Sequence, residues 1–337
     1  MKVDRVARAL GALMGLAVGD ALGMPTQSLP REVIVDRYGP RVTTLEPAAP
    51  DHPIARGMAA GRVTDDTEQA LLLAQLWIER HGAFDPHEFA RRLVAWEEEM
   101  CRRGSQDLLG PSTRHALAAL VAGESIAESG RYGTTNGAAM RIPPIGVAVD
   151  VRDLIALVDT VEEVSRVTHN TGIAIAGAAA IAAAVSAGVS GASVKDAIGV
   201  AQEAAVLGSQ RGYWMAGADV ATRIQWAVSL AQSHGRTDDL LDVIYRLIGT
   251  SVATQESIPA AFAILAACPN DPWEGCCLAA SLGGDTDTIG ALVGAVGGAC
   301  CGVDAFPTSV IEAVAAVNQL ALEPIAHALL NLRDDAR

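Results

Sequence analysis

The chain has 337 residues, of which 50% are hydrophobic and 4% aromatic, and its 39 acidic residues exceed its 25 lysines and arginines, for a net charge of −14. Basic residues form no block that could follow a phosphate backbone, so the composition argues against a nucleic-acid-binding protein. An anionic ligand would need positive charge at its own site, from a metal ion, helix N-termini or a single arginine.

The cysteines and the N-terminus indicate where the chain resides. The six cysteines include two adjacent pairs but no C-x-x-C, which is typical of a reduced, cytoplasmic protein. The first twenty residues combine basic residues with an apolar run, but Asp4 and the lack of a clear cleavage site favour an amphipathic helix over a signal peptide.

The order of apolar and polar residues predicts an all-α protein, folded as one compact multi-helix domain over residues 1–337. A helix is expected over 5–23, an irregular connection over 24–61, and a second helix from Asp65 or Asp66. Further helices are expected over 86–103, 111–122, 151–168, 171–188, 194–207, 216–232, 238–249, 256–267, 272–282, 288–301 and 307–332. No stretch alternates as a β-strand would.

Two apolar runs, over 172–191 and 289–303, resemble membrane spans in length or hydropathy. Alanine and glycine dominate them, and each begins in polar residues, so we expect buried helices rather than spans. Gly290, Gly294 and Gly298 share one helix face, where a neighbouring helix can approach closely.

Two acidic clusters stand at the entrance of apolar helices, in "GRVTDDTEQA" (residues 61–70) and "GGDTDTIG" (residues 283–290). One Asp or Thr is enough to cap a helix, so capping leaves the second carboxylate of each cluster unexplained. Four carboxylates with threonine hydroxyls form an all-oxygen ligand set, which suits Mg²⁺ or Mn²⁺ better than Zn²⁺. If the two clusters converge, the set is large enough for two divalent cations.

Two further polar segments are candidates for ligand contacts. In "GRYGTTNGAAMRIPPIG", glycines flank Asn136 and offer backbone N–H groups to a phosphate or sugar oxygen, with Arg141 as a charged donor. A tight turn with Arg141 in a salt bridge is the alternative, and the double proline should end the helical turn. In "VSRVTHNTGIAIAG", His169 stands at another helix entrance, where a cap or a core hydrogen bond is the commoner role.

Taken in order, these segments resemble the ADP-ribosylglycohydrolase family, which includes dinitrogenase-reductase-activating glycohydrolase. The segments that carry the resemblance are "GALMGLAVGDALGMPTQ", "GRVTDDTEQALLLA", "TTNGAAMRIPPIG", "THNTGIAIAGAAAIAAAV" and "LGGDTDTIGALVGAVGGA". They extend over nearly the whole chain, and five segments in order are far more specific than any one of them.

The resemblance implies an all-α fold with two Mg²⁺ or Mn²⁺ ions in a central cleft at helix N-termini. It also implies hydrolysis, by a metal-bound water, of an N- or O-glycosidic bond to the anomeric carbon of ADP-ribose. The implied metal ligands are Thr64, Asp65, Asp66, Asp285, Asp287 and Thr288, and the implied catalytic residues are Asp65, Asp66 and Asp287. The implied substrate-binding residues are Gln27, Asn136, Gly137, Ala138, Met140, Arg141 and His169. Asp20, in the "GD" of the first helix, is expected to be structural.

One position departs from the family pattern. Family hydrolases commonly carry a glutamate soon after "GDALG", where this chain has Gln27. A glutamine can coordinate a cation or donate a hydrogen bond, but it cannot act as a base. Glu32 and Glu46 lie in the same region and are candidates to substitute for the missing carboxylate.

Several alternatives follow. Gln27 and the shortage of basic residues in the motifs motivate a hydrolase of free nucleosides or other small ribosides, and Gln27 also permits a catalytically silent member. A phosphatase reading of "DTDT" is disfavoured because that motif belongs after a β-strand. The leaving group, and the choice between Mg²⁺ and Mn²⁺, stay open. We expect a monomer or small homo-oligomer with no nucleic-acid or membrane partner.

Overall fold

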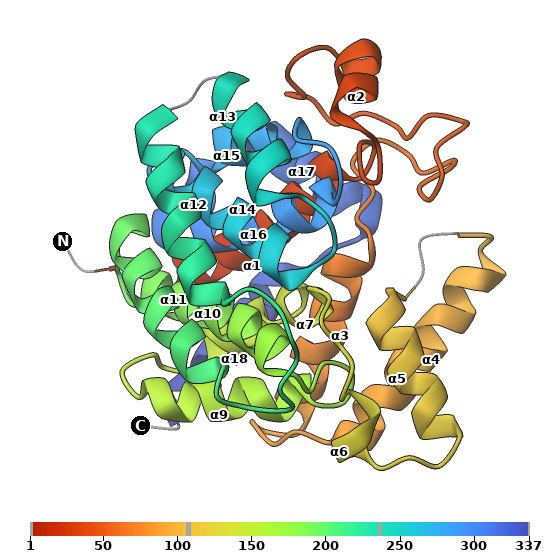
Figure 1. Cartoon of the computed structure of the whole chain (residues 1–337), viewed down its shortest axis with the longest axis vertical. Helices are drawn as coiled ribbons and strands as arrows, with labels where there is room; N and C mark the ends of the chain where they lie inside the picture. The colour runs from red at the N-terminus through yellow and green to blue at the C-terminus, as the bar shows by residue number, and fades with distance from the viewer. Residues whose placement is uncertain (1–2, 106–108, 235–237, 336–337) are drawn as a thin grey trace.

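A computed structural model describes residues 3–105, 109–234 and 238–335, and this part of the chain contains helices and three isolated β-bridges but no β-strand. The all-α class predicted from the sequence is therefore confirmed (Figure 1). The helices are α1 (Arg5–Gly23), α2 (Arg31–Tyr38), α3 (Asp65–Glu79), α4 (Pro86–Arg102), α5 (Pro111–Val121), α6 (Ile126–Ser129), α7 (Gly137–Met140), α8 (Pro143–Ala148), α9 (Leu154–Ser165), α10 (Gly172–Val189), α11 (Val194–Gly208), α12 (Val220–His234), α13 (Asp238–Val243), the π-helix η1 (Ile244–Ile248), α14 (Thr254–Ala267), α15 (Pro272–Ala280), α16 (Thr286–Cys301), the 3₁₀-helix η2 (Val303–Ala305), α17 (Thr308–Asn318) and α18 (Leu322–Asp335).

The first helix and the last Gly-rich helix form the centre of the fold. A Cβ added to Gly15 would lie 2.1 Å from the carbonyl oxygen of Gly294, and one added to Gly19 would lie 1.9 Å from that of Gly290. The two backbones are therefore in direct contact, because only glycine has no Cβ to separate them. The helices run antiparallel, so the C-terminal end of α1 lies beside the N-terminus of α16, and Gly23 contacts the backbone of Asp287.

Helix α10 is the second buried element. Every residue of Gly172–Val189 is buried, and α11 and α16 are among the helices that pack against it. By length and composition, α1 and α10 could each cross a membrane, and in this structure other helices cover 78% and 100% of their apolar windows. The apolar run after residue 288 is likewise a buried helix, as predicted.

Four short helices lie where the sequence predicts none: α2, α6, α8 and η2. Residues 24–61 are not wholly irregular, because α2 forms after Pro30, and Arg31 anchors it by donating to the carbonyl oxygen of Ser281 at 2.6 Å. The double proline follows the helical turn of α7 but also starts α8, because Pro143 and Pro144 occupy a first turn whose N–H groups have no partner within the helix.

Helix ends also differ from expectation near the C-terminus. The single helix expected over 307–332 is two helices, α17 and α18, with a 94° bend between them. Gln319 ends α17 in the left-handed conformation, with φ of 54°, which a non-glycine residue seldom adopts and the sequence does not signal. The segment expected over 238–249 is α13 continued by η1, and α12 begins at Val220 rather than at residue 216.

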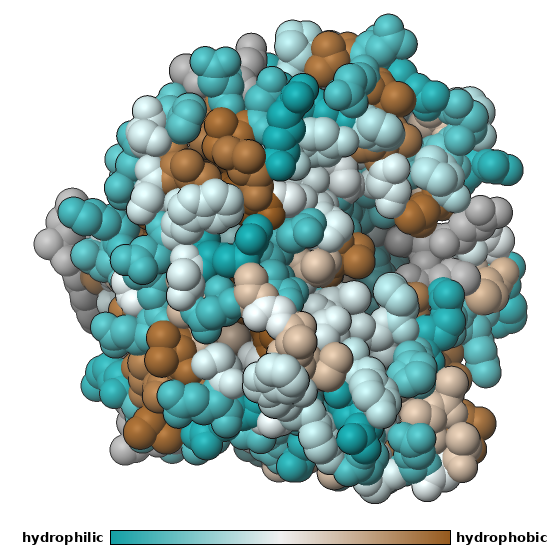
Figure 2. Space-filling view, in the orientation of Figure 1, coloured by the Kyte–Doolittle hydropathy of each residue, from teal (hydrophilic) through white to brown (hydrophobic). Residues whose placement is uncertain are grey.

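The face of the molecule in Figure 2 is largely hydrophilic, and its hydrophobic residues gather in separate patches. The most exposed large hydrophobic side chains of the described chain are those of Val121 and Trp214. Isolated exposed apolar residues are normal for a folded protein and need no partner to explain them.

Candidate active site

The first acidic cluster lies at the N-terminus of α3. Thr64 is the N-cap, and its hydroxyl accepts from the backbone N–H of Asp66. Asp20 on α1 is fully buried and accepts the backbone N–H groups of Thr64 (3.0 Å) and Thr67 (3.1 Å), together with the Thr67 hydroxyl. Asp20 therefore holds the start of α3 against α1, which is a structural role.

The second cluster lies at the N-terminus of α16 and meets the first. The Thr288 hydroxyl donates to Asp66 Oδ2 at 3.2 Å, as does the Thr64 hydroxyl from the other side. Asn136, just before α7, donates to Asp285 Oδ2 at 2.6 Å and to the Ser257 hydroxyl at 2.9 Å. Three segments that are far apart in the sequence thus converge, because α1 and α16 are packed closely enough to bring the two helix entrances together.

The converging carboxylates create a strongly negative, buried environment. Burial raises the pKa of Asp66 well above its ordinary value, and the charges of Asp287, Asp65, Asp20 and Asp285 raise it further. Burial also raises the pKa of Asp20 and of Asp285 to about 6. Carboxylates crowded in this way need either protons or a cation to offset their charge.

The donor set fits a hard divalent cation. Asp66 Oδ1 is buried and has no hydrogen-bond partner within the described residues, which is a costly arrangement unless a cation or water contacts it. The surrounding donors are carboxylate and hydroxyl oxygens, the preferred ligands of Mg²⁺ and Mn²⁺. Across the described ranges no three Asp, Glu, His or Cys side chains are grouped closely enough to hold an ion by themselves. An ion would therefore depend also on threonine oxygens and water.

A cavity of about 240 Å³ opens beside these helix ends. It is lined by eight of the residues predicted from the sequence: Gln27, Asp65, Asn136, Gly137, Met140, Asp285, Asp287 and Thr288. Nine lining residues were not predicted: Ser28, Ile54, Leu109, Gly110, Pro111, Thr113, Arg114, Thr135 and Val252. The cavity lies between the loop after α1 and the starts of α3, α5, α7 and α16.

The other predicted site residues lie behind the cavity wall. Thr64, Asp66, Ala138, Arg141 and His169 are each at most 1% exposed and do not line the cavity. The Arg141 guanidinium donates to Gln69 and Thr168 and lies over the Phe89 ring, 5.3 Å from its centroid. Arg141 therefore does not line the cavity, whereas the sequence led us to expect a direct contact with the substrate.

Gln27 is 5% exposed and lines the cavity, but neither nearby glutamate replaces it. Glu32 is exposed on α2, and Glu46 accepts from the Thr44 hydroxyl at 2.8 Å in a separate surface hollow. The aspartates are therefore the only carboxylates on the wall of the cavity in the described chain.

Arg114, on the first turn of α5, is the only Lys or Arg side chain on this wall in the described chain. Its side chain is 59% exposed, and it donates to the carbonyl oxygen of Leu109 at 3.0 Å. The sequence signal was a helix start, "GPSTR", with no acidic cluster to draw attention to it.

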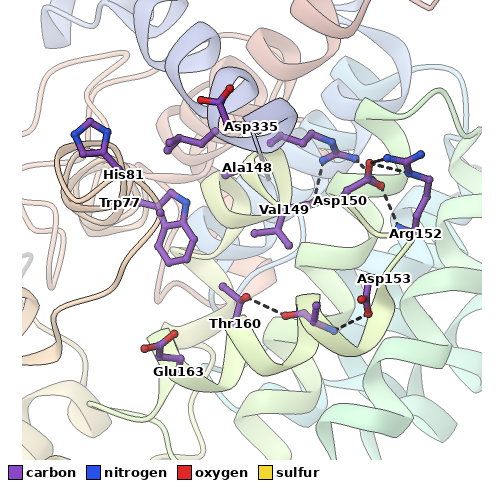
Figure 3. Close-up of a pocket in the computed structure, with 14 residues that line it drawn as sticks. Trp77, His81, Ala148, Val149, Asp150, Arg152, Asp153, Thr160, Glu163 and Asp335 are labelled. Atoms are coloured by element: carbon purple, nitrogen blue, oxygen red, sulfur yellow. Dashed lines mark hydrogen bonds and ion pairs between the residues drawn. The ribbon is translucent and has the colours of Figure 1, made fainter. Parts of the chain in front are cut away.

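A larger cavity of about 1020 Å³ lies away from the acidic helix ends, between the end of α3, α9 and α18 (Figure 3). Its charged groups largely satisfy one another. Asp150 accepts from Arg152 at 2.9 Å, and Asp153 caps α9 by accepting from the N–H of Ala156 at 3.0 Å. The smaller cavity, with its crowded carboxylates, is the better candidate for an active site.

The chain belongs to the ADP-ribosylglycohydrolase family, whose sequence model matches residues 1–337. It is therefore a hydrolase of the glycosidase type. Both the family and the enzyme class predicted from the sequence are confirmed.

Known proteins resemble the chain over most of its length. The uncharacterized protein YegU of Escherichia coli (strain K12) is 34% identical over 333 residues, which cover 99% of this chain and 98% of that protein. The ADP-ribosylarginine hydrolase Tri1 of Pseudomonas putida (strain GB-1) is 29% identical over 313 residues, covering 91% of this chain and 74% of that enzyme. A solved structure described as an ADP-ribosylglycohydrolase-related protein complex has a TM-score of 0.71 and 27% identity, and the match covers 98% of this chain and 99% of that one.

Proposed function

We propose that the chain hydrolyses an N- or O-glycosidic bond to the anomeric carbon of ADP-ribose in the 240 Å³ cavity, with two divalent cations, Mg²⁺ or Mn²⁺, at its wall. The observation that carries this proposal is the buried, unpartnered Asp66 Oδ1 amid four other carboxylates. The residues that would hold the ions are Thr64, Asp65, Asp66, Asp285, Asp287 and Thr288. Bound ions of this kind stabilise negative charge on oxygen and make water a stronger nucleophile.

Hydrogen bonds from side chains of the protein orient the carboxylates of the proposed site. The Thr288 and Thr64 hydroxyls both donate to Asp66 Oδ2, and Asn136 donates to Asp285, so these carboxylates are held in fixed orientations. Gly137 allows the His169 ring to pack directly against the start of α7, since a Cβ there would lie 2.8 Å from the ring. Rigid placement of this kind lowers the cost of bringing a substrate into its reactive position.

The substrate class is supported by the relatives. One similar protein is named an ADP-ribosylarginine hydrolase, so an ADP-ribosylated arginine side chain is the first leaving group to test. Arg114 offers the one positive side chain on the described cavity wall, which suits a diphosphate at the rim.

A hydrolase of free nucleosides or other small ribosides is the second candidate. A volume of about 240 Å³ lies below the usual range for cavities that take drug-sized ligands, roughly 300–1,000 Å³. Arg141 is also turned away from the cavity, which leaves less positive charge for a diphosphate. A catalytically silent member is a further alternative, motivated by Gln27.

The test is calorimetric titration with ADP-ribose and with ribose, each in Mg²⁺ and after complete chelation, followed by hydrolysis assays on ADP-ribosylarginine and on nucleosides. Metal-dependent binding of ADP-ribose and release of arginine would support the proposal. Binding of ribose with no gain from the ADP part would favour the small-riboside hydrolase. Absence of binding and of hydrolysis would favour the silent member.

Location and assembly stay predictions. We expect a cytoplasmic monomer or small homo-oligomer that acts on a riboside or ADP-ribosylated substrate and has no nucleic-acid or membrane partner. Size-exclusion chromatography with light scattering, together with fractionation of cells, would test these expectations.

A further inference from the structure

A buried chain of hydrogen bonds connects two walls of the cavity, and Arg141 lies at its centre. Arg141 is 1% exposed, and its hydrogen-bond partners in the described chain are uncharged. Nη1 donates to Gln69 Oε1 at 3.3 Å, and Nη2 donates to the Thr168 hydroxyl. Burial lowers the pKa of Arg141 to about 10, so the guanidinium stays protonated at neutral pH.

The first arm leads to the acidic cluster. A guanidinium has donors but no acceptor, so the side chain of Gln69 must face Arg141 with its oxygen. The amide nitrogen then faces Asp65, and Nε2 donates to Asp65 Oδ2 at 2.9 Å. Arg141, which only donates, and the Asp65 carboxylate, which only accepts, require the same orientation of the Gln69 amide, and Gln69 in turn holds one oxygen of an expected metal ligand.

The second arm leads to the opposite wall. Arg141 Nη2 donates to the Thr168 hydroxyl and also faces His169 Nδ1 at 3.5 Å, so a hydrogen on Nδ1 would point at a guanidinium N–H. Nδ1 therefore accepts, and the Thr168 hydroxyl donates to it at 2.7 Å. Burial lowers the pKa of His169 well below its ordinary value, and the charge of Arg141 lowers it further, so the ring is neutral. A neutral ring whose Nδ1 accepts must carry its hydrogen on Nε2. His169 Nε2 therefore donates to the Thr135 hydroxyl at 2.9 Å.

Thr135 is the end of this arm and lines the cavity. Because its oxygen accepts from His169, its hydrogen is available for an acceptor in the cavity. We propose that Arg141 is a positioning residue that joins the two arms and sets the direction of the second, and that Thr135 donates a hydrogen bond to an oxygen of the ribosyl ligand. The identity of the ligand rests on the proposed function, whereas the direction of the hydrogen bonds does not.

The direction is tested without any ligand by ¹⁵N NMR of the full chain labelled at histidine, with His169→Gln to assign the resonance. The expected wild-type result is a neutral ring protonated on Nε2 from pH 5 to 8. Arg141→Met should populate the form protonated on Nδ1, because no guanidinium N–H then faces Nδ1 and the Thr168 oxygen can accept from it. Arg333→Met is the matched control: Arg333 is also 1% exposed, but it donates to the carbonyl oxygens of residues 146, 147, 149 and 186.

A wild-type ring protonated on Nδ1, or charged at pH 6, would overturn the assigned direction, and this measurement needs no variant to fold. An unchanged tautomer in folded Arg141→Met would likewise overturn the role of Arg141. The same tautomer change in Arg333→Met would show that loss of any buried guanidinium is sufficient, and would also overturn it.

The role of Thr135 is tested by calorimetric titration with ADP-ribose in Mg²⁺. Thr135→Val should weaken binding about fivefold to tenfold, the loss of one hydrogen bond. Thr160→Val, which removes a hydroxyl on α9 that bonds to the Ala156 carbonyl oxygen, should bind as the wild type does. Equal affinity of Thr135→Val and wild type would overturn the role of Thr135. Failure of the wild type to bind would instead refute the proposed function, and the NMR result would still decide the direction.

Discussion

The contact between α1 and α16 predicts that a single methyl group will destabilise the protein. In Gly19→Ala, the new Cβ would lie 1.9 Å from the carbonyl oxygen of Gly290, whereas such atoms normally stay more than 3.0 Å apart. The obstacle is backbone on both sides, so the helices must separate by about an ångström. Overpacking of this kind typically costs about 1–3 kcal/mol, and the rigid partner places this variant at the upper end.

The matched control is Gly199→Ala, in the middle of α11. Nothing lies within 4 Å of a Cβ added there, so alanine should stabilise the helix by about 0.5–1 kcal/mol. Two variants with the same chemical change should therefore have opposite effects on the free energy of unfolding. The assay is urea denaturation followed by helical circular dichroism, with the midpoint compared at equal slope.

Equal midpoints for wild type and Gly19→Ala would refute the close approach of the two helices. A fall in both variants would show that the loss comes from glycine replacement in general and not from the contact. Because α16 starts beside the end of α1, we also expect Gly19→Ala to weaken Mg²⁺ binding more than its loss of stability alone explains.

Three more predictions concern the carboxylates. Burial raises the pKa of Asp20 and Asp285 from 3.8 to about 6, so their contribution to stability is fully present below pH 3.8 and is lost as pH rises through 6. Thermal unfolding of chelated protein should therefore show a falling midpoint over this range, restored by Mg²⁺ at pH 7; a flat profile in chelator would contradict it. Asp287→Ala should reduce Mg²⁺-dependent turnover at least about 100-fold with near-native circular dichroism, and full activity would exclude the proposed ions. Asn136→Leu, which removes the donor to Asp285, should weaken Mg²⁺ binding about 10- to 100-fold in calorimetry, and unchanged affinity would argue against that role.

The sequence predicts the acidic clusters because the acidic side chains themselves form the signal. Asp65, Asp66, Asp285 and Asp287 stand next to helix starts that composition and periodicity locate to within a residue or two. Their convergence is less visible, since it depends on Gly15 and its neighbours in α1 meeting the glycines of α16. Only one side of that contact was apparent as a small-residue face.

Burial of polar residues is what the sequence could not predict. Arg141 has the appearance of a phosphate ligand because it follows a glycine-rich turn, but Phe89 and Gln69, from α4 and α3, enclose it. Those contacts join residues more than fifty positions apart. The opposite holds for Arg114 and Thr135: Arg114 lies in no marked segment, Thr135 lies in a marked segment but was not itself predicted, and the packing of α5 and of the loop before α7 places both at the cavity.

The pairing of α1 with α16 also determines how late in synthesis the protein can complete its fold. About 270 residues separate Gly19 from Gly290, so a ribosome must synthesise all of them before the two glycines can meet. Until then the glycine face of α1 has no helix to pack against, and the aspartates at the N-termini of α3 and α16 remain apart. Such long-range closure slows folding and leaves apolar surface to be shielded during synthesis. A nascent chain truncated before residue 286 would be expected to depend on chaperones, and it would lack Asp287 and Thr288 of the proposed ion site.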